Sequence, residues 1–388
     1  MVLFFHLQIT DTTMAHKRID ILMMGGSRGG FENIVNQTAV YLTQNGFQIR
    51  YVQLLAPDAA WEAPEVSSCC LELDRDNVSL EEARVSYAAL LQADSIKPSL
   101  IFATGWPYLI YVSKGASSDA AAQIPVVAWP HDDLQYYEEG GSGDISLFQY
   151  ADICFAINNK IAQDLYNAYP EKPIYRTYNS FDPARVRYSE DRNTQKLAYV
   201  GRLSDKKVIP IILYALERTK APWRLMLAGG GEEESSLRKL ASELHLKDRV
   251  SFLGWQEDPF SSVTDCRALV MSSIYEGAPL TVLEALASGM QLISTPVGNV
   301  EEILSDPVCG EIVPFGDPDA LATALDRLID TPFTPDIAAA CKALTADYLP
   351  ENTLYDFLRK TEACIQLMLL PEHYTPENRC LYIRRNPL

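Results

Sequence analysis

The sequence has few positive charges for its size, with 33 Lys and Arg against 51 Asp and Glu and a formal net charge of −18. Nucleic-acid affinity depends on neutralising phosphates with basic side chains, so this balance disfavours a nucleic-acid-binding protein. It also disfavours strong electrostatic docking on anionic lipid. No run approaches the ~18 apolar residues that a membrane-spanning helix requires. We therefore expect a cytoplasmic protein, with at most peripheral contact at the inner face of a membrane.

Two other patterns are missing. None of the eight cysteines forms a C-x-x-C pair, which argues against zinc and thioredoxin-like sites and favours a reducing compartment. The glycines after the first predicted strand do not follow the G-x-G-x-x-G spacing, so a nicotinamide oxidoreductase is the weakest enzyme class. The pattern of regular elements begins near Lys17, and residues 1–15 are expected to form a tail.

The sequence does contain two successive series of short apolar runs that alternate with longer helical stretches. Continuous apolar runs are typical of parallel strands that are covered on both faces. The 388 residues, 47% of them hydrophobic, suffice for two domains with large cores. The predicted strands of the first series are 18–26, 47–55, 99–105, 125–131, 152–158 and 173–179. Those of the second series are 196–202, 223–231, 249–254, 267–273, 291–296 and 310–315.

This organisation predicts two doubly wound α/β domains. The polar segment 180–195 is the expected boundary. We assign residues 1–185 to an N-terminal domain and residues 186–350 to a C-terminal domain. Residues 351–388 are predicted to form a helix that returns to the first domain, followed by a tail. Asp258-Pro259 and Asp317-Pro318 each predict a capped helix start.

Ligands of open parallel sheets bind beyond the carboxyl ends of the strands, so the residues that follow each strand are the candidates for a site. Gly29 and Gly30 precede a helix and leave its first N–H groups open to an anion or a sugar hydroxyl. An ordinary tight turn is the simpler interpretation of this loop taken alone.

The segment after the seventh predicted strand carries two cations, Arg202 and Lys207. Two cations at the mouth of a cleft suit a diphosphate, because each charged hydrogen bond contributes roughly 1.5–3 kcal/mol. The alternative is a pair of solvated side chains on a loop.

The stretch YEGAPLTVLEAL at 275–286 follows another strand and opens a helix. Three of its N–H groups are predicted to point into the cleft, those of Gly277, Ala278 and Leu280, whereas Pro279 has none. They would form an anion-binding cradle opposite the two cations.

Two glutamates flank this cradle. Glu284 is expected about two turns into the helix, where a carboxylate can accept two ribose hydroxyls. Glu276 lies on the loop and can meet a sugar on the other side of the phosphates. The spacing fits a ligand made of nucleoside, diphosphate and sugar in a line. Two helix-terminal surface carboxylates are the alternative.

Several segments together resemble the glycosyltransferases of family 4, which have the GT-B fold. In the second half these are YVGRLSDKK, LAGGGEEE, RVSFLGW and SSIYEGAPLTVLEALASGMQLISTPVGNVEEIL. In the first half they are GGSRGGFENIV and YNSFD. The resemblance extends from about residue 18 to residue 370. It implies retaining transfer of a sugar from a nucleotide diphosphate by two Rossmann-like domains.

The resemblance also implies roles for individual residues. Arg202 and Lys207 would hold the diphosphate, Glu284 the ribose, and Glu276 with the following turn the donor sugar and distal phosphate. His131 would lie beside the donor sugar, and a strand-end histidine satisfied by backbone is the equal alternative.

One position departs from the family pattern. Val208 stands where the family usually has a glycine after the lysine of this motif. The departure leaves open whether Lys206 or Lys207 contacts phosphate.

The expected function is hexosyl transfer, with a UDP-sugar as the favoured donor and a glycan or lipid-linked glycan as acceptor, in bacterial-type polysaccharide biosynthesis. No cofactor and no metal are required by such a fold. Two alternatives share the fold: a UDP-sugar 2-epimerase and a non-catalytic glycan-binding subunit.

Overall fold

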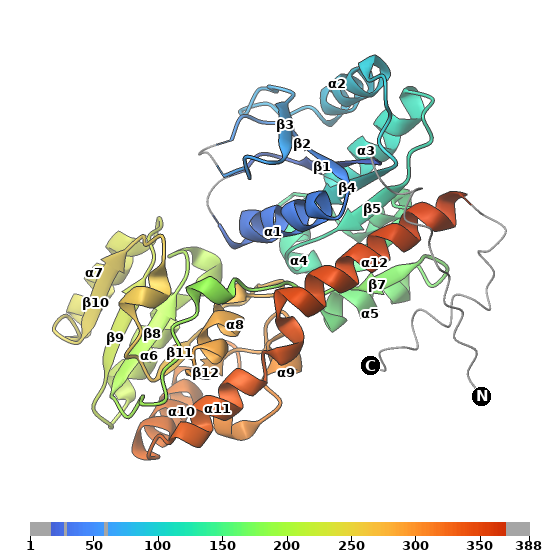
Figure 1. The fold of residues 1–388 in the computed structure, drawn as a ribbon. Coiled ribbons are helices and arrows are strands. Elements are labelled where there is room, and N and C mark those ends of the chain that lie inside the picture. Colours follow the sequence, from blue (N-terminus) through green and yellow to red (C-terminus); the bar gives the residue numbers. More distant parts are fainter. Residues whose placement is uncertain (1–16, 27–28, 58–60, 370–388) are drawn as a thin grey trace, which may run out of the picture.

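The computed structural model describes residues 17–26, 29–57 and 61–369. The expected tail at 1–15 lies outside these residues. Two parallel sheets, each covered by helices, form the two halves of the molecule in Figure 1. This is the predicted pair of doubly wound α/β domains.

The first sheet has seven strands in the order β3-β2-β1-β4-β5-β6-β7. Every pairing in it is parallel, and strands such as β4 are buried along their whole length because helices cover both faces. Its strands are β1 (Arg18–Met23), β2 (Gln48–Gln53), β3 (Ser67–Cys70), β4 (Leu100–Thr104), β5 (Val126–Trp129), β6 (Ile153–Ala156) and β7 (Ile174–Arg176). Its helices are α1 (Gly30–Gln44), α2 (Leu80–Ala93), α3 (Tyr108–Asp119), α4 (Leu134–Glu139), η1 (Ile145–Tyr150) and α5 (Asn159–Ala168).

The second sheet has six parallel strands in the order β10-β9-β8-β11-β12-β13. A 3-10 turn, η2 (Pro183–Arg185), lies in the segment that leads to it. Its strands are β8 (Lys196–Val200), β9 (Arg224–Ala228), β10 (Val250–Gly254), β11 (Ala268–Val270), β12 (Gln291–Ser294) and β13 (Gly310–Ile312). Its helices are η3 (Asp205–Lys207), α6 (Ile209–Arg218), α7 (Glu234–Glu243), η4 (Pro259–Ser262), α8 (Leu280–Ala287), α9 (Val300–Ile303), η5 (Pro307–Cys309), α10 (Pro318–Asp330), α11 (Pro335–Ala343) and η6 (Ala346–Tyr348).

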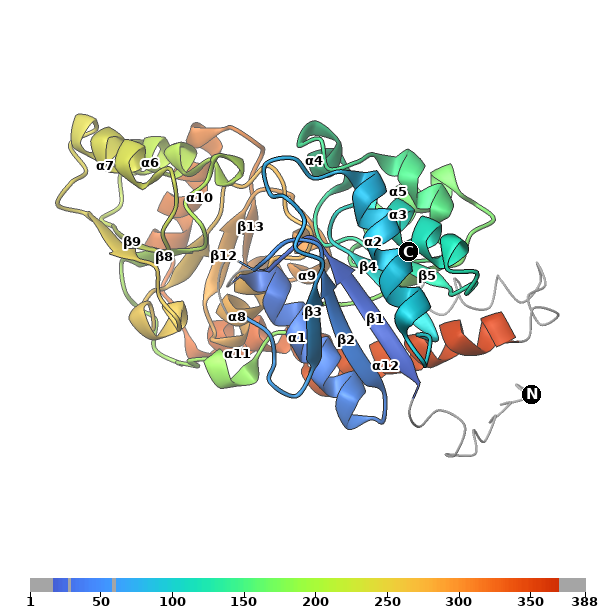
Figure 2. The same ribbon diagram turned by 90° about the horizontal axis from the view of Figure 1, so that it is seen from above.

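The last described helix, α12 (Pro350–Leu369), follows the second domain in sequence but lies along the first (Figures 1 and 2). The ring of Phe357 is buried, and its centroid lies 4.8 Å from that of Trp129 and 5.1 Å from that of Phe155. The core of the first sheet is therefore completed by the far end of the chain. The domain limits at residues 185 and 350 remain a proposal.

All twelve predicted strands are confirmed, and one observed strand was not predicted. That strand, β3, is a four-residue edge strand of sequence SSCC that pairs only with β2. Its polar, half-exposed residues lack the apolar run by which the other strands were recognised. The cap predicted at Asp317 is confirmed, because its carboxylate accepts hydrogen bonds from the N–H groups of Asp319 and Ala320.

The cap predicted at Asp258 is wrong. Only a 3-10 turn follows it, and its side chain makes no capping hydrogen bond. The carboxylate instead forms an ion pair with Arg187 through Oδ2, and its Oδ1 has no hydrogen-bond partner among the described residues.

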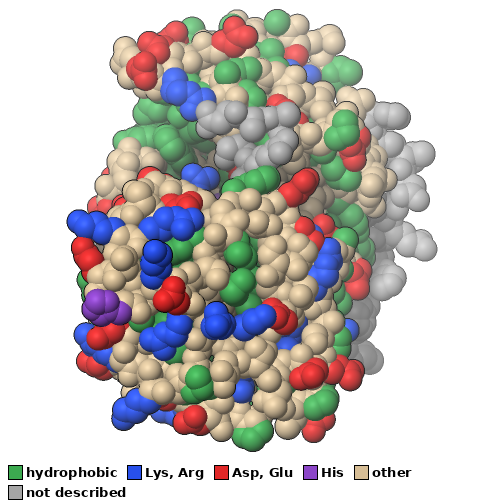
Figure 3. Space-filling model, turned by 90° about the vertical axis from the view of Figure 1, so that its left-hand side faces the viewer, with side chains coloured by type: hydrophobic (Ala, Val, Ile, Leu, Met, Phe, Trp, Pro, Cys, Tyr) green, Lys and Arg blue, Asp and Glu red, His purple; other side chains and the backbone are tan. Residues whose placement is uncertain are grey.

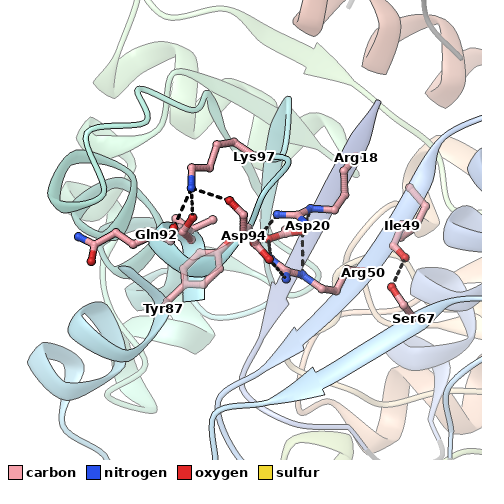
Figure 4. Close-up of polar contacts among 10 residues, drawn as sticks. Arg18, Asp20, Ile49, Arg50, Ser67, Tyr87, Gln92, Asp94 and Lys97 are labelled. Atoms are coloured by element: carbon pink, nitrogen blue, oxygen red, sulfur yellow. Dashed lines mark hydrogen bonds and ion pairs between the residues drawn. The ribbon is translucent and has the colours of Figure 1, made fainter. Parts of the chain in front are cut away.

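A buried polar network lies where β1 begins, at the amino ends of the strands and away from the edge at which ligands are expected (Figure 4). Arg50 donates to both carboxylate oxygens of the fully buried Asp20, and the Tyr87 hydroxyl lies 3.0 Å from one of them. Arg18 and Arg50 also contact Asp94, just after α2. The network ties α2 to the sheet, and we interpret it as structural.

The surface of the second domain carries charges of both signs. Figure 3 shows Lys and Arg side chains lying among Asp and Glu side chains over this side of the molecule. None of the helices within the described residues combines the length and apolar character needed to cross a membrane.

Candidate functional site

The candidate site lies at the carboxyl ends of β8 and β11, where the loops that follow these strands meet the first domain. The loop after β8 leads into η3, which carries Lys207. The loop after β11 carries Glu276 and leads into α8. Parallel strands end at the same edge of the sheet, and the structure accordingly brings these two loops into contact.

Lys207 and Glu276 form a mostly buried ion pair between the two loops. The Ser273 hydroxyl donates to the same carboxylate oxygen over 2.8 Å. Ser272 donates to the backbone carbonyls of Lys207 and Val208, which fixes η3 against this loop. The structure thus brings together a cation and a carboxylate that the sequence analysis had placed on two sides of one ligand.

The helix α8 begins where the cradle was predicted, with Pro279 at the N-cap position. Within the described part of the chain, the N–H groups of Gly277, Ala278 and Leu280 have no hydrogen-bond acceptor. Glu284 is the fifth residue of α8, slightly more than one turn into the helix rather than the expected two turns.

The first domain packs directly against this cradle. The Asn158 amide donates to the Gly277 carbonyl over 2.8 Å. A Cβ atom added to Gly277 would lie 2.1 Å from the His131 carbonyl oxygen, so only glycine fits this position. Gly29 is the N-cap residue of α1, and a Cβ on Gly30 would lie 3.9 Å from Leu280. The amino ends of α1 and α8 therefore lie close together, and both favour an anion between them.

Arg202 is exposed, and its guanidinium forms no hydrogen bond or ion pair with another side chain of the described residues. Its carbonyl accepts a hydrogen bond from the Tyr199 hydroxyl at 2.8 Å, which fixes the backbone at the strand end. The structure places Arg202 in the loop after β8, as predicted, but does not pair it with the cradle.

Glu284 is buried, and its nearest cation is Arg185, whose Nη1 lies 3.7 Å from its carboxylate oxygen. Burial raises the pKa of Glu284 to about 7, because the charge of Arg185 only partly offsets the loss of water. A carboxyl group whose pKa lies near neutrality for lack of a close partner is suited to accept hydrogen bonds from a ligand.

His131 follows β5, and its ring packs between Phe31 at 4.8 Å and Trp129 at 4.4 Å, measured between ring centroids. Its backbone N–H donates to the Tyr137 hydroxyl over 3.0 Å. Nε2 is buried and has no hydrogen-bond partner among the described residues. Burial lowers the pKa of His131 to about 3, so the imidazole is neutral and can donate or accept a single hydrogen bond at this nitrogen.

A second cation of the same loop, Lys206, reaches the first domain. Its Nζ lies 2.6 Å from the Asp132 carboxylate and 4.1 Å from the centroid of the Tyr136 ring. Burial raises the pKa of Asp132 although Lys206 opposes the shift. Sequence reasoning did not identify Asp132, although the motif that contains His131 also contains it.

A groove of about 420 Å³ lies beside Glu284, between α1 and the second domain. Arg185 belongs both to this groove and to the Glu284 pair. Every lining residue has a polar or charged group that can bind a hydroxyl: Asn33, Asn36, Gln37, Asp182, Arg185, Glu257 and Asp258. Sequence reasoning did not find this groove, because its two walls come from different domains.

Comparison with known proteins finds glycosyltransferases that are similar to this chain. Residues 180–343 match a family model described as glycosyl transferases group 1. The lipopolysaccharide 1,6-galactosyltransferase of Escherichia coli (strain K12) is 25% identical over 314 residues, which are 78% of this chain and 86% of that protein.

Two solved structures resemble the whole chain. The apo form of the lipopolysaccharide outer core galactosyltransferase WaaB has a TM-score of 0.71 at 20% identity, covering 89% of this chain and 98% of that one. Anabaena HepE in complex with UDP and glucose has a TM-score of 0.72 at 19% identity, covering 90% of this chain and 100% of that one. At this identity the likeness establishes the fold, which is GT-B.

Proposed function

We propose a reaction for this protein from one premise, namely that residues 180–343 belong to glycosyl transferases group 1 and that the whole chain is a glycosyltransferase with the GT-B fold. The reaction is transfer of a hexose from UDP to a glycan or lipid-linked glycan, with retention of configuration, in the synthesis of a bacterial polysaccharide. Within the GT-B enzymes we assign the chain to family 4, on the motifs quoted above. The UDP-bound and lipopolysaccharide-directed relatives support this choice of donor and acceptor.

The observation that carries the proposal is the ion pair of Lys207 and Glu276 at the open N–H groups of α8. The diphosphate binds at these N–H groups and at Lys207, and Arg202 approaches it from solvent. A ligand phosphate replaces Glu276 as the partner of Lys207, which leaves the Glu276 carboxylate free to accept hydroxyl hydrogen bonds from the sugar. Lys207 and Glu276 thus pair with each other at the positions where the phosphate and the sugar hydroxyls bind.

The nucleoside lies on the other side of the cradle. Glu284 accepts the ribose hydroxyls, and the polar groove beside it receives the rest of the nucleoside. Nucleoside, diphosphate and sugar then follow one line from the groove to His131.

The chemical step depends on stabilising the leaving diphosphate. Charge develops on its oxygen atoms as the bond to the sugar breaks, and Lys207, Arg202 and the amino end of α8 stabilise that charge. His131 is neutral and offers Nε2 to a sugar hydroxyl. The family resemblance implies that the leaving phosphate takes the acceptor proton, so the protein contributes position and electrostatics.

Gly29 and Gly30, at the amino end of α1, contribute N–H groups to the donor, and the acceptor binds beyond them on the side of the first domain. We place it there because Lys207, Glu276 and Glu284, which bind the donor, all belong to the second domain. The carboxyl edge of the first sheet faces the same cleft.

The sharpest test is Glu276→Gln. UDP affinity, measured by calorimetry, should stay equal or rise, because the phosphate no longer competes with a carboxylate for Lys207. Turnover of UDP-glucose or UDP-galactose, measured as UDP release with and without glycoside acceptors, should fall by about a hundredfold or more. Loss of UDP binding with intact turnover would contradict the assignment.

The same assays separate the alternatives. A UDP-sugar 2-epimerase would convert the donor without acceptor and without releasing UDP. A non-catalytic subunit would bind UDP or glycan with no turnover of any donor.

A further inference from the structure

The two neighbouring lysines of η3 point to different domains. Lys207 turns toward Glu276 of its own domain, whereas Lys206 reaches across the cleft to Asp132 of the first domain. Within the described residues, the Lys206 side chain contacts Asp132 and the Tyr136 ring. Its backbone N–H donates to the Asp205 carboxylate, and its carbonyl accepts from the N–H of Ile274. Lys206 and Lys207 thus pair with carboxylates of different domains.

The contact at Lys206 is well satisfied and largely shielded from water. The Lys206 and Asp132 side chains are 22% and 17% exposed, so solvent screens this pair less than a surface pair. The other oxygen of Asp132 accepts the N–H of Asp133 over 3.1 Å, which orients the carboxylate. A phosphate that recruited Lys206 would leave this half-buried carboxylate without its cation.

Neighbouring aromatic residues extend the same contact. The Tyr136 ring lies 5.7 Å from that of Tyr275, and the Tyr275 hydroxyl donates to Glu139 over 2.8 Å. Tyr275 precedes Glu276 in the chain, so the first-domain loop at 131–139 is attached to both loops that form the candidate site. We call this set of contacts, from Asp132, Tyr136 and Glu139 to Lys206 and Tyr275, the cross-cleft clamp.

The cross-cleft clamp acts next to the histidine. Asp132 directly follows His131, whose carbonyl oxygen packs against Gly277 so closely that no Cβ fits between them. The His131 ring is held by Phe31 and Trp129, and its buried Nε2 has no partner among the described residues. A buried nitrogen without a partner is costly unless a ligand satisfies it, and its place beside the cradle makes the donor sugar that ligand.

We propose that Lys206 is a positioning residue that acts through Asp132, holding His131 at the sugar end of the donor and so setting the rate of transfer rather than nucleotide affinity. The inference rests on the proposed function, since it assigns His131 to a bound sugar. A misplacement of the order of 1 Å at a reacting group is enough to lower a rate a hundredfold.

The experiment compares Lys206→Met with Lys207→Met, a matched pair that removes one charge each from adjacent residues. UDP affinity is measured by calorimetry, and kcat is measured from UDP release with UDP-glucose and UDP-galactose. Lys206→Met should keep UDP affinity within about twofold and lower kcat by about tenfold or more, whereas Lys207→Met should weaken UDP binding at least about tenfold. Lys206→Arg should restore most of kcat, because a guanidinium also reaches Asp132 and stacks on Tyr136.

A double-mutant cycle tests the route through the histidine. In a His131→Asn background, Lys206→Met should lower kcat no further. In the second cycle, the double variant of Lys206→Met and Asp132→Asn should lower kcat no more than either single variant does. Additive losses in both cycles, or a loss of UDP affinity equal to that of Lys207→Met, would overturn the proposal. If the wild type turns over the donor and Lys206→Met has the same kcat, this inference is wrong but the proposed function stands. Absence of any donor turnover by the wild type rejects the proposed function and this inference with it.

Discussion

Two buried glutamates eight positions apart differ in what neutralises them. Glu276 has an ion pair with Lys207 and a hydrogen bond from Ser273. The nearest cation to Glu284 lies 3.7 Å away and forms no hydrogen bond with it. Burial raises the pKa of Glu284 to about 7, because Arg185 only partly offsets the loss of water. Substitution of Glu284 should therefore have an effect that depends on pH.

Glu284→Gln should make the ligand-free protein more stable at pH 8 but not at pH 5. The folded-state pKa lies above the usual 4.5, so the folded protein holds an extra proton between about pH 4.5 and 7, and its stability falls as pH rises through that window. A shift of this size corresponds to a few kcal/mol at about 1.4 kcal/mol per pKa unit. Thermal unfolding of both proteins at the two pH values measures the effect, and an equal gap at both would refute it.

Whereas the stability of the wild type should fall as pH rises, its affinity for UDP should increase. The ionised carboxylate is the better acceptor for ribose hydroxyls, so wild-type affinity should rise between pH 6 and pH 8. In Glu284→Gln this rise should be lost and the affinity at pH 8 should drop by about 1–3 kcal/mol. Calorimetry with UDP across this range checks both statements.

At the scale of an element, the junction between η3 and α6 is strained. Val208 lies in the left-handed region with φ 43° and ψ 42°, where a β-branched side chain is a genuine outlier. The family pattern quoted above has a glycine at this position. Such strain costs about 1–3 kcal/mol and persists only where surrounding contacts hold it, as Ser272 does here through the Val208 carbonyl.

Replacing Val208 should therefore stabilise the protein. Val208→Asn should raise the unfolding temperature by several degrees, and Val208→Gly by less, because glycine costs more entropy on folding. Val186→Gly is the matched control, since Val186 is also half-buried outside the strands but has an ordinary φ of −74°. Val186→Gly should lower the unfolding temperature of the protein. Lower unfolding temperatures for both Val208 variants would show that the position is not strained.

The elements also show what the sequence could and could not predict. Apolar runs revealed twelve strands, and the shared carboxyl edge of parallel strands predicted that the loops of Lys207 and Glu276 would face one cleft. The direct ion pair between the two side chains was not predicted. The edge strand Ser67–Cys70 carries no apolar run, so only its pairing with β2 defines it. The cap at Asp258 failed because only the 3-10 turn Pro259–Ser262 follows it, and its carboxylate accepts none of the N–H groups of that turn. The polar groove and the contact of Lys206 with Asp132 depend on how two domains dock, which no local pattern encodes.

For the whole molecule, α12 joins the two ends of the chain in one core. Its Phe357 is 3% exposed and lies among the rings of Phe102, Trp129 and Phe155. Phe357→Ala should lower the free energy of unfolding by about 3–5 kcal/mol. Tyr355→Ala on the same helix is the control, because that side chain is 55% exposed and should change stability little. Denaturant unfolding measures both, and equal effects would show that α12 does not complete this core.

This path of the chain also has a consequence during synthesis. The strands of the first sheet leave the ribosome early, but the helix that covers their aromatic residues is translated only after the whole second domain. At typical elongation rates of about 5–20 residues per second, the nascent first domain waits on the order of ten seconds for it. During this interval Phe102, Trp129 and Phe155 lack their covering helix, while the second domain already has all its strands. The second half of the protein is thus the first that can complete its folding, and chaperones that recognise exposed aromatic residues would bind the nascent first half.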